Sequence, residues 1–280
     1  MGVFTQSTQY TQRLNIQKLY QGPGDVFSGA WSWGGFRAYS LATLGTNAVR
    51  LRRDSDNAEQ DFASQIPGGG LDASALSSFK GAANLFLVKG YDQTGNGRDW
   101  TQATAANQCP VTLSSLNGQP TSSWSCSTTP IFRLVNSSSI ATITMPITYS
   151  VVANVGTARA STIMWIGGST QLSSALAAFR YGLYNGSSFS VNATSGVWTS
   201  LQAVFSATAA NGALYINGSG TTGNTGNTDL KNGNPVALGD NVNPSTGADF
   251  SAAEFGVWMA EMTSGQAASM SSNIRSYWGF

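Results

Sequence analysis

Few side chains in this 280-residue sequence are suited to catalysis. The chain has only three glutamates, Glu59, Glu254 and Glu261, and none lies between residues 60 and 253. Histidine is absent, so the usual nucleophilic triads lack their general base. A glycosidase needs two carboxyl groups, about 5–5.5 Å apart in a retaining enzyme and farther apart in an inverting one. A hydrolytic site that uses glutamate would therefore have only three residues to draw on.

The cysteines and glycines suggest no metal or cofactor site. Cys109 and Cys126 lie in one loop-rich stretch and can pair, although synthesis in the cytoplasm favours free thiols. Two lone cysteines without histidine cannot complete a zinc site. The glycine run at residues 68–70 lacks the Lys and the strand-to-helix context of a phosphate loop. The sequence therefore predicts no metal and no cofactor.

The most distinctive polar segment spans residues 91–99, with the sequence YDQTGNGRD. Acidic and amide side chains alternate there with glycines, and their oxygens can accept hydrogen bonds from backbone N–H groups in a tight turn. The segment predicts a turn that holds two strands together. The alternative is a ligand loop in which Asp92, Gln93 and Asn96 contact a sugar or a calcium ion, although the spacing matches no known calcium loop.

Low charge favours strands over helices. Charged residues make up 10% of the chain, against roughly 25% in an ordinary soluble domain. Uncharged polar residues and glycine replace them, which suits strands and turns better than long solvated helices. The net charge of +1 argues against a nucleic-acid partner, because such partners are bound through clustered Lys and Arg. The one basic cluster, Arg50, Arg52 and Arg53, is followed directly by acidic residues, which indicates a solvated or locally paired face.

The N-terminal segment differs from the remainder. Residues 1–25 are polar, rich in Gln and Thr, and end in a Gly-Pro-Gly-Asp turn. We interpret them as an arm that docks on a partner, with a first edge strand as the alternative, and residues 26–280 as one domain. The start of the chain lacks the pattern of a signal peptide, which predicts synthesis in the cytoplasm. No apolar run reaches the roughly 20 residues that span a bilayer, so we expect no membrane insertion.

The local patterns predict mainly strands after residue 30. Alternating apolar residues at 47–53 indicate a half-buried strand, and the apolar run at 85–92 indicates a buried one. Short β-rich runs broken by Gly and Asn fill residues 141–262, as in a sandwich or barrel. Asn211-Gly212 predicts a two-residue type I′ hairpin turn. Residues 105–135 look like an insertion loop.

Two helices are predicted. Residues 71–80 carry apolar side chains at helical spacing, with Asp72 able to cap the first turn. A second helix is predicted close to the end of the chain, with Ser264 able to cap its first turn. We expect it to close the chain against the sandwich through one face, which consists of Ala267, Met270, Ile274 and Trp278.

Several strings resemble the catalytic domain of the family 54 α-L-arabinofuranosidases. These are residues 91–99 followed by Thr101-Gln102-Ala103, the run 37–62, the string Gly239-Asp240-Asn241, and residues 262–265 before the last helix. The likeness covers most of the chain from about residue 22 onward. It implies a mostly β chain folded as a concanavalin A-like jelly-roll β-sandwich, with a short C-terminal helix and an N-terminal arm.

The resemblance preserves only half of that family's catalytic pair. The nucleophilic Glu of the family follows paired cysteines in a mid-chain strand, where residues 162–172 have TIMWIGGSTQL, so this position is not matched. The acid/base Asp lies in a Gly-Asp-Asn string, which Asp240 matches. We therefore expect no enzyme and keep Asp240 as a weak catalytic candidate. If Asp240 is not catalytic, it is a turn residue or, together with Asn241, a contact to a ligand. Asp92 or Glu254 is possible as a substitute nucleophile, but nothing in the sequence favours either.

Residues 22–40 and 103–108 are also similar to proteins of tailed bacteriophages and prophages with a concanavalin-like (LamG-type) domain. This resemblance implies a virion structural protein, in a head decoration, a fibre or a tail-associated position. We expect its arm to contact other virion proteins and its copies to form a symmetric homo-oligomer. The alternatives are a glycoside hydrolase of arabinofuranosidase type with Asp240 as the acid, and a free lectin-like module.

Aromatic residues near the predicted loops could contact a host-surface glycan, because sugar C–H faces stack on rings. Trp100, Trp124 and Trp198 are placed there, although a tryptophan is most often part of the core. Trp124, in the string TSSWSC, is the best candidate for exposure.

Overall fold

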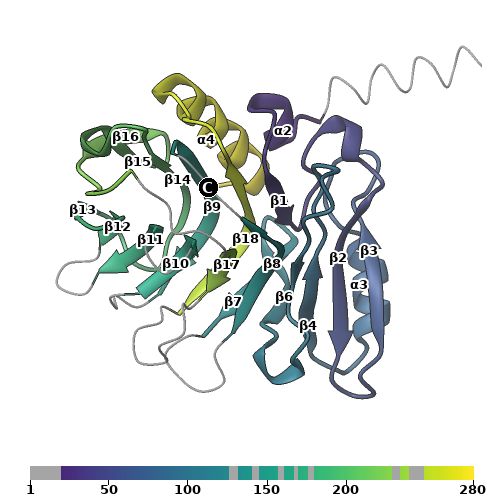
Figure 1. Cartoon of the computed structure of the whole chain (residues 1–280). Helices are drawn as coiled ribbons and strands as arrows, with labels where there is room; N and C mark the ends of the chain where they lie inside the picture. The colour runs from purple at the N-terminus through teal and green to yellow at the C-terminus, as the bar shows by residue number, and fades with distance from the viewer. Residues whose placement is uncertain are drawn as a thin grey trace, which may run out of the picture.

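Figure 1 shows the computed structural model of the chain, in which antiparallel strands form a β-sandwich with helices at its periphery. The prediction of a mostly β chain with a short C-terminal helix is confirmed. The structure describes residues 20–125, 132–140, 145–156, 161–166, 170–175, 180–228, 234–239 and 249–280. Residues 1–19 of the predicted arm, and with them the possible edge strand, lie outside this part.

The described strands are β1 (Ser32–Gly35), β2 (Asn47–Arg53), β3 (Glu59–Ala63), β4 (Leu85–Gly90), β5 (Trp100–Thr101), β6 (Pro110–Leu116), β7 (Gln119–Trp124), β8 (Arg133–Ile140), β9 (Ile147–Val155), β10 (Ser161–Ile166), β11 (Thr170–Ala175), β12 (Arg180–Tyr184), β13 (Ser188–Asn192), β14 (Trp198–Phe205), β15 (Gly212–Ile216), β16 (Ser219–Gly223), β17 (Asn234–Gly239) and β18 (Phe250–Trp258). The α-helices are α2 (Pro23–Val26), α3 (Ala73–Lys80) and α4 (Ser264–Trp278), and single 3₁₀ turns lie at Leu41–Thr43, Ala105–Asn107 and Ala209–Asn211.

Two sheets diverge from the shared strands β3, β2 and β4. Leu85 and Phe86 of β4 pair with β6, and this ladder continues through β7, β18, β9, β14 and β15 to β16. Lys89 and Gly90 of β4 pair instead with β5, and the second ladder continues through β8, β17, β10, β11 and β12 to β13. The sheets face each other across one hydrophobic core.

Rows of apolar side chains cross both sheets on their facing sides. In the first sheet Leu201 of β14 pairs with Val151 of β9, which pairs with Phe255 of β18, and all three are buried. In the second, Met164 of β10 pairs with Leu238 of β17. Removing such rows from water stabilises the fold by roughly 25 cal/mol for each Å² of apolar surface buried.

Helix α4 lies against β14, on the face of the first sheet that points away from the core (Figure 1). The predicted contact face is confirmed, because Ala267, Met270, Ile274 and Trp278 are all fully buried. The cap is Thr263, one residue before the predicted Ser264, and its side chain accepts a hydrogen bond from the N–H of Gln266. This bond satisfies one of the donors that a helix start leaves unpaired.

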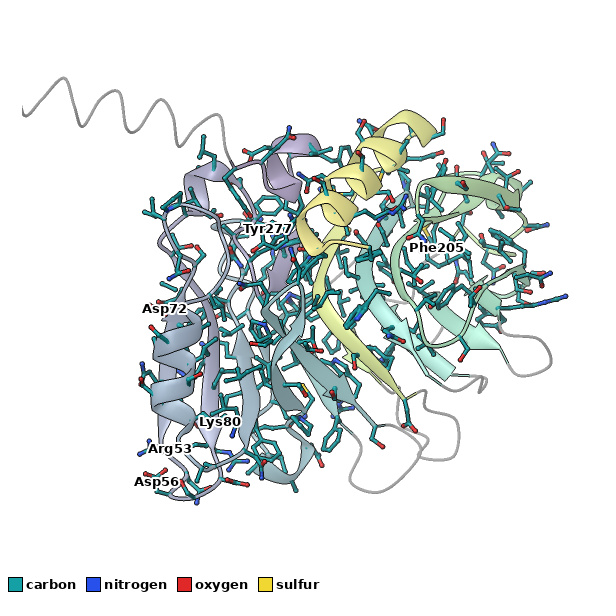
Figure 2. All side chains as sticks on the ribbon, turned by 180° about the vertical axis from the view of Figure 1, so that it is seen from behind. Arg53, Asp56, Asp72, Lys80, Phe205 and Tyr277 are labelled. Atoms are coloured by element: carbon teal, nitrogen blue, oxygen red, sulfur yellow. The ribbon has the colours of Figure 1, made fainter. Side chains whose placement is uncertain are left out.

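The helix predicted at residues 71–80 is also confirmed, as α3. The carboxylate of Asp72 accepts hydrogen bonds from the N–H groups of Ser74 and Ala75. Figure 2 shows Asp72 and Lys80 at the two ends of this helix, on the outside of the β2–β3 edge. Asp72 thus has the capping role that its position in the sequence indicates.

Two local predictions are wrong. Asn211-Gly212 forms no type I′ turn, because Asn211 closes a 3₁₀ turn and Gly212 has φ −55°. Positive φ at both central residues occurs instead at Asn117-Gly118 (48° and 72°) and Asn217-Gly218 (52° and 86°), which join β6 to β7 and β15 to β16. The predicted insertion loop at residues 105–135 contains β6 and β7 in its described part.

The basic cluster is locally paired, as predicted. Arg50 of β2 binds Asp61 on the neighbouring β3, with Nε 2.6 Å from Oδ1, and Arg53 binds Asp56 at 2.6 Å. The Arg50 hydrogen bond lowers the pKa of Asp61. Figure 2 shows Arg53 and Asp56 at the end of the molecule opposite Tyr277. These arginines therefore belong to cross-strand and turn contacts rather than to an open basic patch.

Candidate ligand-binding site

Asp92 forms the centre of the 91–99 turn. Its carboxylate accepts hydrogen bonds from the backbone N–H of Trp33 (3.2 Å), of Thr94 (3.2 Å) and of Arg98 (3.0 Å). The carboxylate therefore closes its own turn and ties it to β1. This is the arrangement that the turn interpretation requires.

Gln93 and Asn96 also bind the segment that leads into and out of β1. Gln93 is buried, and its side chain accepts from the N–H of Tyr39 (2.9 Å) and donates to the carbonyl of Arg37 (2.8 Å). The exposed Asn96 donates to the carbonyl of Ala30 at 3.3 Å. The candidates Asp92, Gln93 and Asn96 are thus brought together by a structural turn, and a role for them in ligand binding stays a prediction.

The expected exposure of Trp124 is wrong. Trp124 is only 2% exposed, and its ring stacks on Phe250 with centroids 5.6 Å apart and planes 7° apart. Its indole N–H donates to Ser122 at 2.9 Å. Trp124 is the last residue of β7 rather than part of a loop, and the pairing of β7 with β18 directs its ring toward the core. Trp100 is fully buried, and Trp198 is partly buried.

The described glutamates are all engaged in contacts of the fold. Glu254 forms a bidentate ion pair with Arg37, with Nη2 2.8 Å from Oε1, and both side chains are completely buried. Glu261 accepts a hydrogen bond from Ser206 at 2.9 Å, and Glu59 lies 3.9 Å from Arg50. Because Glu254 has no exposed surface, it cannot act as the substitute nucleophile. Asp240 and Asn241 lie outside the described residues.

Arg37 also joins the core to helix α4. Its guanidinium lies over the ring of Tyr277, 4.5 Å from the centroid, and donates to Asn273 at 3.1 Å. Burial acts to lower the pKa of Arg37, but its attraction to Glu254 raises it above the ordinary value. Asn273 in turn donates to the carbonyl of Gln21 at 2.7 Å. A chain of polar contacts therefore runs from β18 to the point where the N-terminal segment meets α4.

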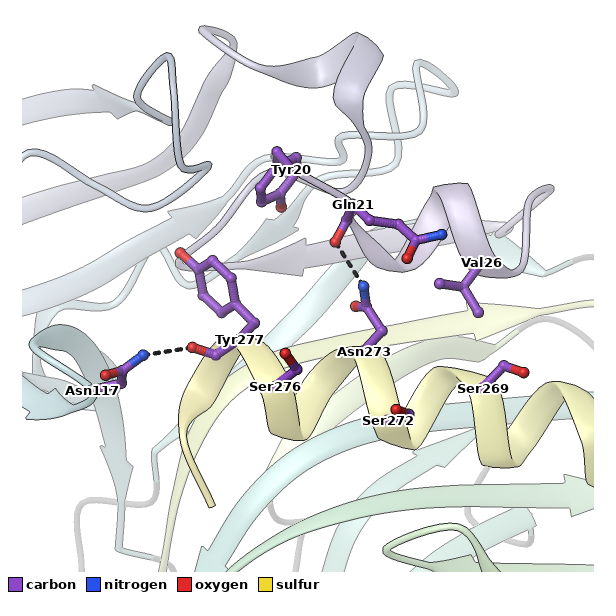
Figure 3. Close-up of a pocket in the computed structure, with 9 residues that line it drawn as sticks. All are labelled: Tyr20, Gln21, Val26, Asn117, Ser269, Ser272, Asn273, Ser276 and Tyr277. Atoms are coloured by element: carbon purple, nitrogen blue, oxygen red, sulfur yellow. Dashed lines mark hydrogen bonds between the residues drawn. The ribbon is translucent and has the colours of Figure 1, made fainter. Parts of the chain in front are cut away.

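A cavity of about 780 Å³ opens between the N-terminal segment and α4 (Figure 3). We call it the α2/α4 groove. Its volume lies within the range of small-molecule sites. Its lining residues are Tyr20, Gln21, Val26, Asn117, Ser269, Ser272, Asn273, Ser276 and Tyr277.

The two tyrosines close one end of the groove. Tyr20 is 5% exposed and donates its hydroxyl to the carbonyl of Ala38. Its ring meets that of Tyr277 edge-on, with centroids 6.2 Å apart. Burial raises the pKa of Tyr277 to about 12 and also raises the pKa of Tyr20, so both phenols stay neutral at physiological pH.

Residues 20–25, which the sequence assigned to the arm, thus pack on the body of the protein. Asp25 caps the turn by accepting from the N–H groups of Gly22 and Leu41, each at 2.8 Å. The division of the chain at residue 25 stays a prediction, but any experiment that removes the arm should leave Tyr20 in place.

A smaller cavity of about 300 Å³ lies at the opposite ends of the strands. It is lined by Ser123, Trp124, Asn154, Gly156, Asp249, Phe250 and Ser251. Asp249 directly follows residues 240–248, which lie outside the described part of the chain. The α2/α4 groove is therefore the better-defined site.

Little in the sequence indicates the groove. Its walls come from residues 20–26, from Asn117 in the β6–β7 turn and from α4, which are far apart along the chain. One usable signal lies in α4, where Ser269, Ser272 and Ser276 recur at helical spacing on the face that points away from the sheet.

Within the described ranges, no cluster of three His, Cys, Asp or Glu side chains could hold a metal ion. No described helix is both long enough and apolar enough to cross a bilayer. Cys109 is buried, and Cys126 lies outside the described residues.

Solved structures share the fold, whereas no family profile and no curated protein sequence matches the chain. A mutant family 54 α-L-arabinofuranosidase soaked with 4-nitrophenyl α-L-arabinofuranoside superimposes with a TM-score of 0.73 and 17% identity. The match covers 92% of this chain and 66% of that chain, slightly less than two thirds of its length.

Two further structures are similar. An arabinofuranosidase complexed with arabinofuranosyl-α-1,2-xylobiose gives a TM-score of 0.70 at 18% identity, over 92% of this chain and 65% of that one. The binding domain of Paraclostridial Mosquitocidal Protein 1 gives 0.52 at 11% identity, over 68% and 52%. At these identities the comparisons show the β-sandwich fold alone.

Proposed function

We propose that this chain is a structural protein of a bacteriophage particle whose β-sandwich binds host-surface glycan without hydrolysing it. The observation that carries the proposal, and that argues against hydrolysis, is the burial of Glu254 in an ion pair. In a fold shared with arabinofuranosidases, this glutamate is fully buried and paired with Arg37, where no substrate can reach it. The chain also has no Glu at the expected nucleophile position within residues 162–172.

The proposed location is the virion. The phage-like strings at residues 22–40 and 103–108 support it, as does a polar segment of 19 residues before the anchored Tyr20. In this proposal the segment contacts other virion proteins, and the copies assemble as a symmetric homo-oligomer. The sandwich then faces outward.

The second candidate function is an arabinofuranosidase with Asp240 as the acid. The similarity over 92% of the chain to an arabinofuranosidase soaked with 4-nitrophenyl α-L-arabinofuranoside favours it. Hydrolysis of that same compound by the full chain and by Asp240→Asn separates the two functions. We expect no turnover by either protein. Turnover by the wild-type chain that disappears in Asp240→Asn would establish the hydrolase and refute the non-catalytic proposal.

Deletion of residues 2–19 tests the particle role. Tyr20 stays, because it is buried and anchors the start of the fold. We expect the truncated protein to keep the thermal unfolding transition and the glycan binding of the full chain but to lose incorporation into particles during infection. Normal incorporation would contradict a docking arm. Absence of the full chain from purified particles would favour the alternative of a free lectin-like module.

A further inference from the structure

We propose that the α2/α4 groove is the glycan site and that its ligand is a neutral oligosaccharide. This inference rests on the proposed function, and it adds a location and a chemical class. Figure 3 shows the groove between the N-terminal segment and α4, with Tyr20 and Tyr277 at one end and the serines of α4 along its floor.

The charge of the lining selects the ligand class. None of the nine lining residues is charged. A divalent cation would find no carboxylate there, and a phosphate or an acidic sugar would find no Lys or Arg. The nearest buried cation, Arg37, is already neutralised by its ion pair with Glu254. The exposed Arg275 of α4 lines the adjoining cavity instead, and its Nε donates to the carbonyl of Phe280 at 3.0 Å. The groove is therefore suited to an uncharged ligand.

The polar groups of the lining match those of a sugar. Ser269, Ser272 and Ser276 are exposed, and within the described residues their hydroxyls bind no other protein group. Each hydroxyl can both donate and accept, as each sugar hydroxyl can. Amides of Gln21 and Asn117 provide further donors and acceptors on the other walls. An apolar ligand would leave these groups without partners.

The length of the groove favours several sugar units over one. The serines lie at spacings of three and four residues, so they share one face of α4. From Ser269 to Ser276 the helix rises by about 10 Å. A chain of sugar rings can follow this row, with the partly exposed ring of Tyr277 at one end.

The walls are held in position without a ligand. Asn273 donates a hydrogen bond to the carbonyl of Gln21, and the hydroxyl of Tyr20 donates one to the carbonyl of Ala38. The ring of Tyr277 packs against the guanidinium of Arg37. A preorganised site loses little conformational entropy on binding. The buried ion pair beneath α4 thus positions the groove although it does not line it.

Filling the groove tests the site. Ser272→Trp and Ser276→Trp each place a large ring in it at exposed positions, and Ser78→Trp makes the same change on the exposed face of α3 as a matched control. Binding is measured by calorimetry with arabinofuranosyl-xylobiose and with neutral xylo-, manno- and galacto-oligosaccharides, and acidic oligogalacturonate serves as the charged comparison. We expect binding of a neutral probe to weaken at least tenfold in both groove variants and less than twofold in Ser78→Trp.

The outcomes distinguish the site from the function. Equal binding by the wild type and both groove variants would overturn the assignment of the groove as the glycan site, while the proposal of glycan binding would stand. Preferential binding of oligogalacturonate would overturn the assignment of a neutral ligand. Failure of the wild-type chain to bind any probe would overturn both proposals. A second measurement does not depend on whether the variants fold. In the wild-type protein, the side-chain amide NMR signals of Asn117 and Gln21 should shift when the oligosaccharide that binds is added. Unchanged signals would contradict the assignment of the groove.

Discussion

The buried pair of Arg37 and Glu254 gives the sharpest test of how the fold is held together. We consider Glu254→Gln, which keeps the shape of the side chain and removes its charge. Arg37 would then remain in the core with a full positive charge and no counter-ion, since both side chains have 0% exposure. Its Nη1 already has no hydrogen-bond partner among the described residues.

The expected cost follows from the burial. Removing one partner of a buried ion pair destabilises a protein by about 3–5 kcal/mol, because an uncompensated charge stays in a low-dielectric environment. With a urea m value of roughly 3 kcal/mol/M for a chain of this size, the unfolding midpoint should fall by about 1–1.7 M. Replacing both residues, as in Arg37→Met with Glu254→Met, should cost less than either single change, since no unpaired charge remains.

Equilibrium urea unfolding, followed by tryptophan fluorescence and by circular dichroism, measures these costs. The matched control is Glu59→Gln, the same change at an exposed ion pair, where the side chains of Glu59 and Arg50 are 39% and 37% exposed and 3.9 Å apart. Exposed pairs contribute about 0–1 kcal/mol, so the control midpoint should barely move. A cost below about 1 kcal/mol for Glu254→Gln would refute the assignment of a fully desolvated pair.

Three further predictions concern local contacts. Thr263→Ala removes the N-cap of α4 and should cost about 1 kcal/mol in urea unfolding. Gly69→Ala should destabilise far more than Gly265→Ala in thermal unfolding, because Gly69 has φ +76° and its added Cβ would lie 2.1 Å from a buried tyrosine ring, whereas Gly265 faces open space. For Asp61, whose pKa is lowered by Arg50, the stabilisation is present above the unfolded-state pKa and lost as pH falls through the folded-state value. The stability difference between wild type and Asp61→Asn should therefore be constant at neutral pH and shrink below about pH 4.

Local periodicity predicted the parts of the fold that depend on near neighbours. The buried face of α4 and the Asp72 cap follow from residues within one or two helical turns. The positions of the hairpin turns are harder to predict, because Asn-Gly promotes a type I′ turn only where the flanking strands end next to it. Six residues, 206–211, separate the end of β14 at Phe205 from the start of β15, so Asn211-Gly212 closes a longer connection.

Long-range pairing explains most of what the sequence did not reveal. Trp124 looks like a loop residue by composition, yet it becomes part of the core because β7 pairs with β18, more than 120 residues later. The α2/α4 groove has the same origin, since the fold brings its three wall segments together. Asp240 and Asn241 lie outside the described residues, so a catalytic role for Asp240 stays a prediction.

The outer face of the first sheet shows why alternation alone is a weak guide to exposure. Polar residues two positions apart occur in both β9 (Thr148 and Ser150) and β14 (Ser200 and Gln202), a pattern typical of a strand with one face in water. Ser150, Ser200 and Gln202 are nevertheless completely buried, because α4 covers that face. Gln202 donates to Ser200 at 2.8 Å, so the layer satisfies part of its own hydrogen-bonding capacity. Small polar side chains let a helix dock closely on a sheet, and the same docking leaves the serines of α4 on its opposite side to line a groove that is open to ligands.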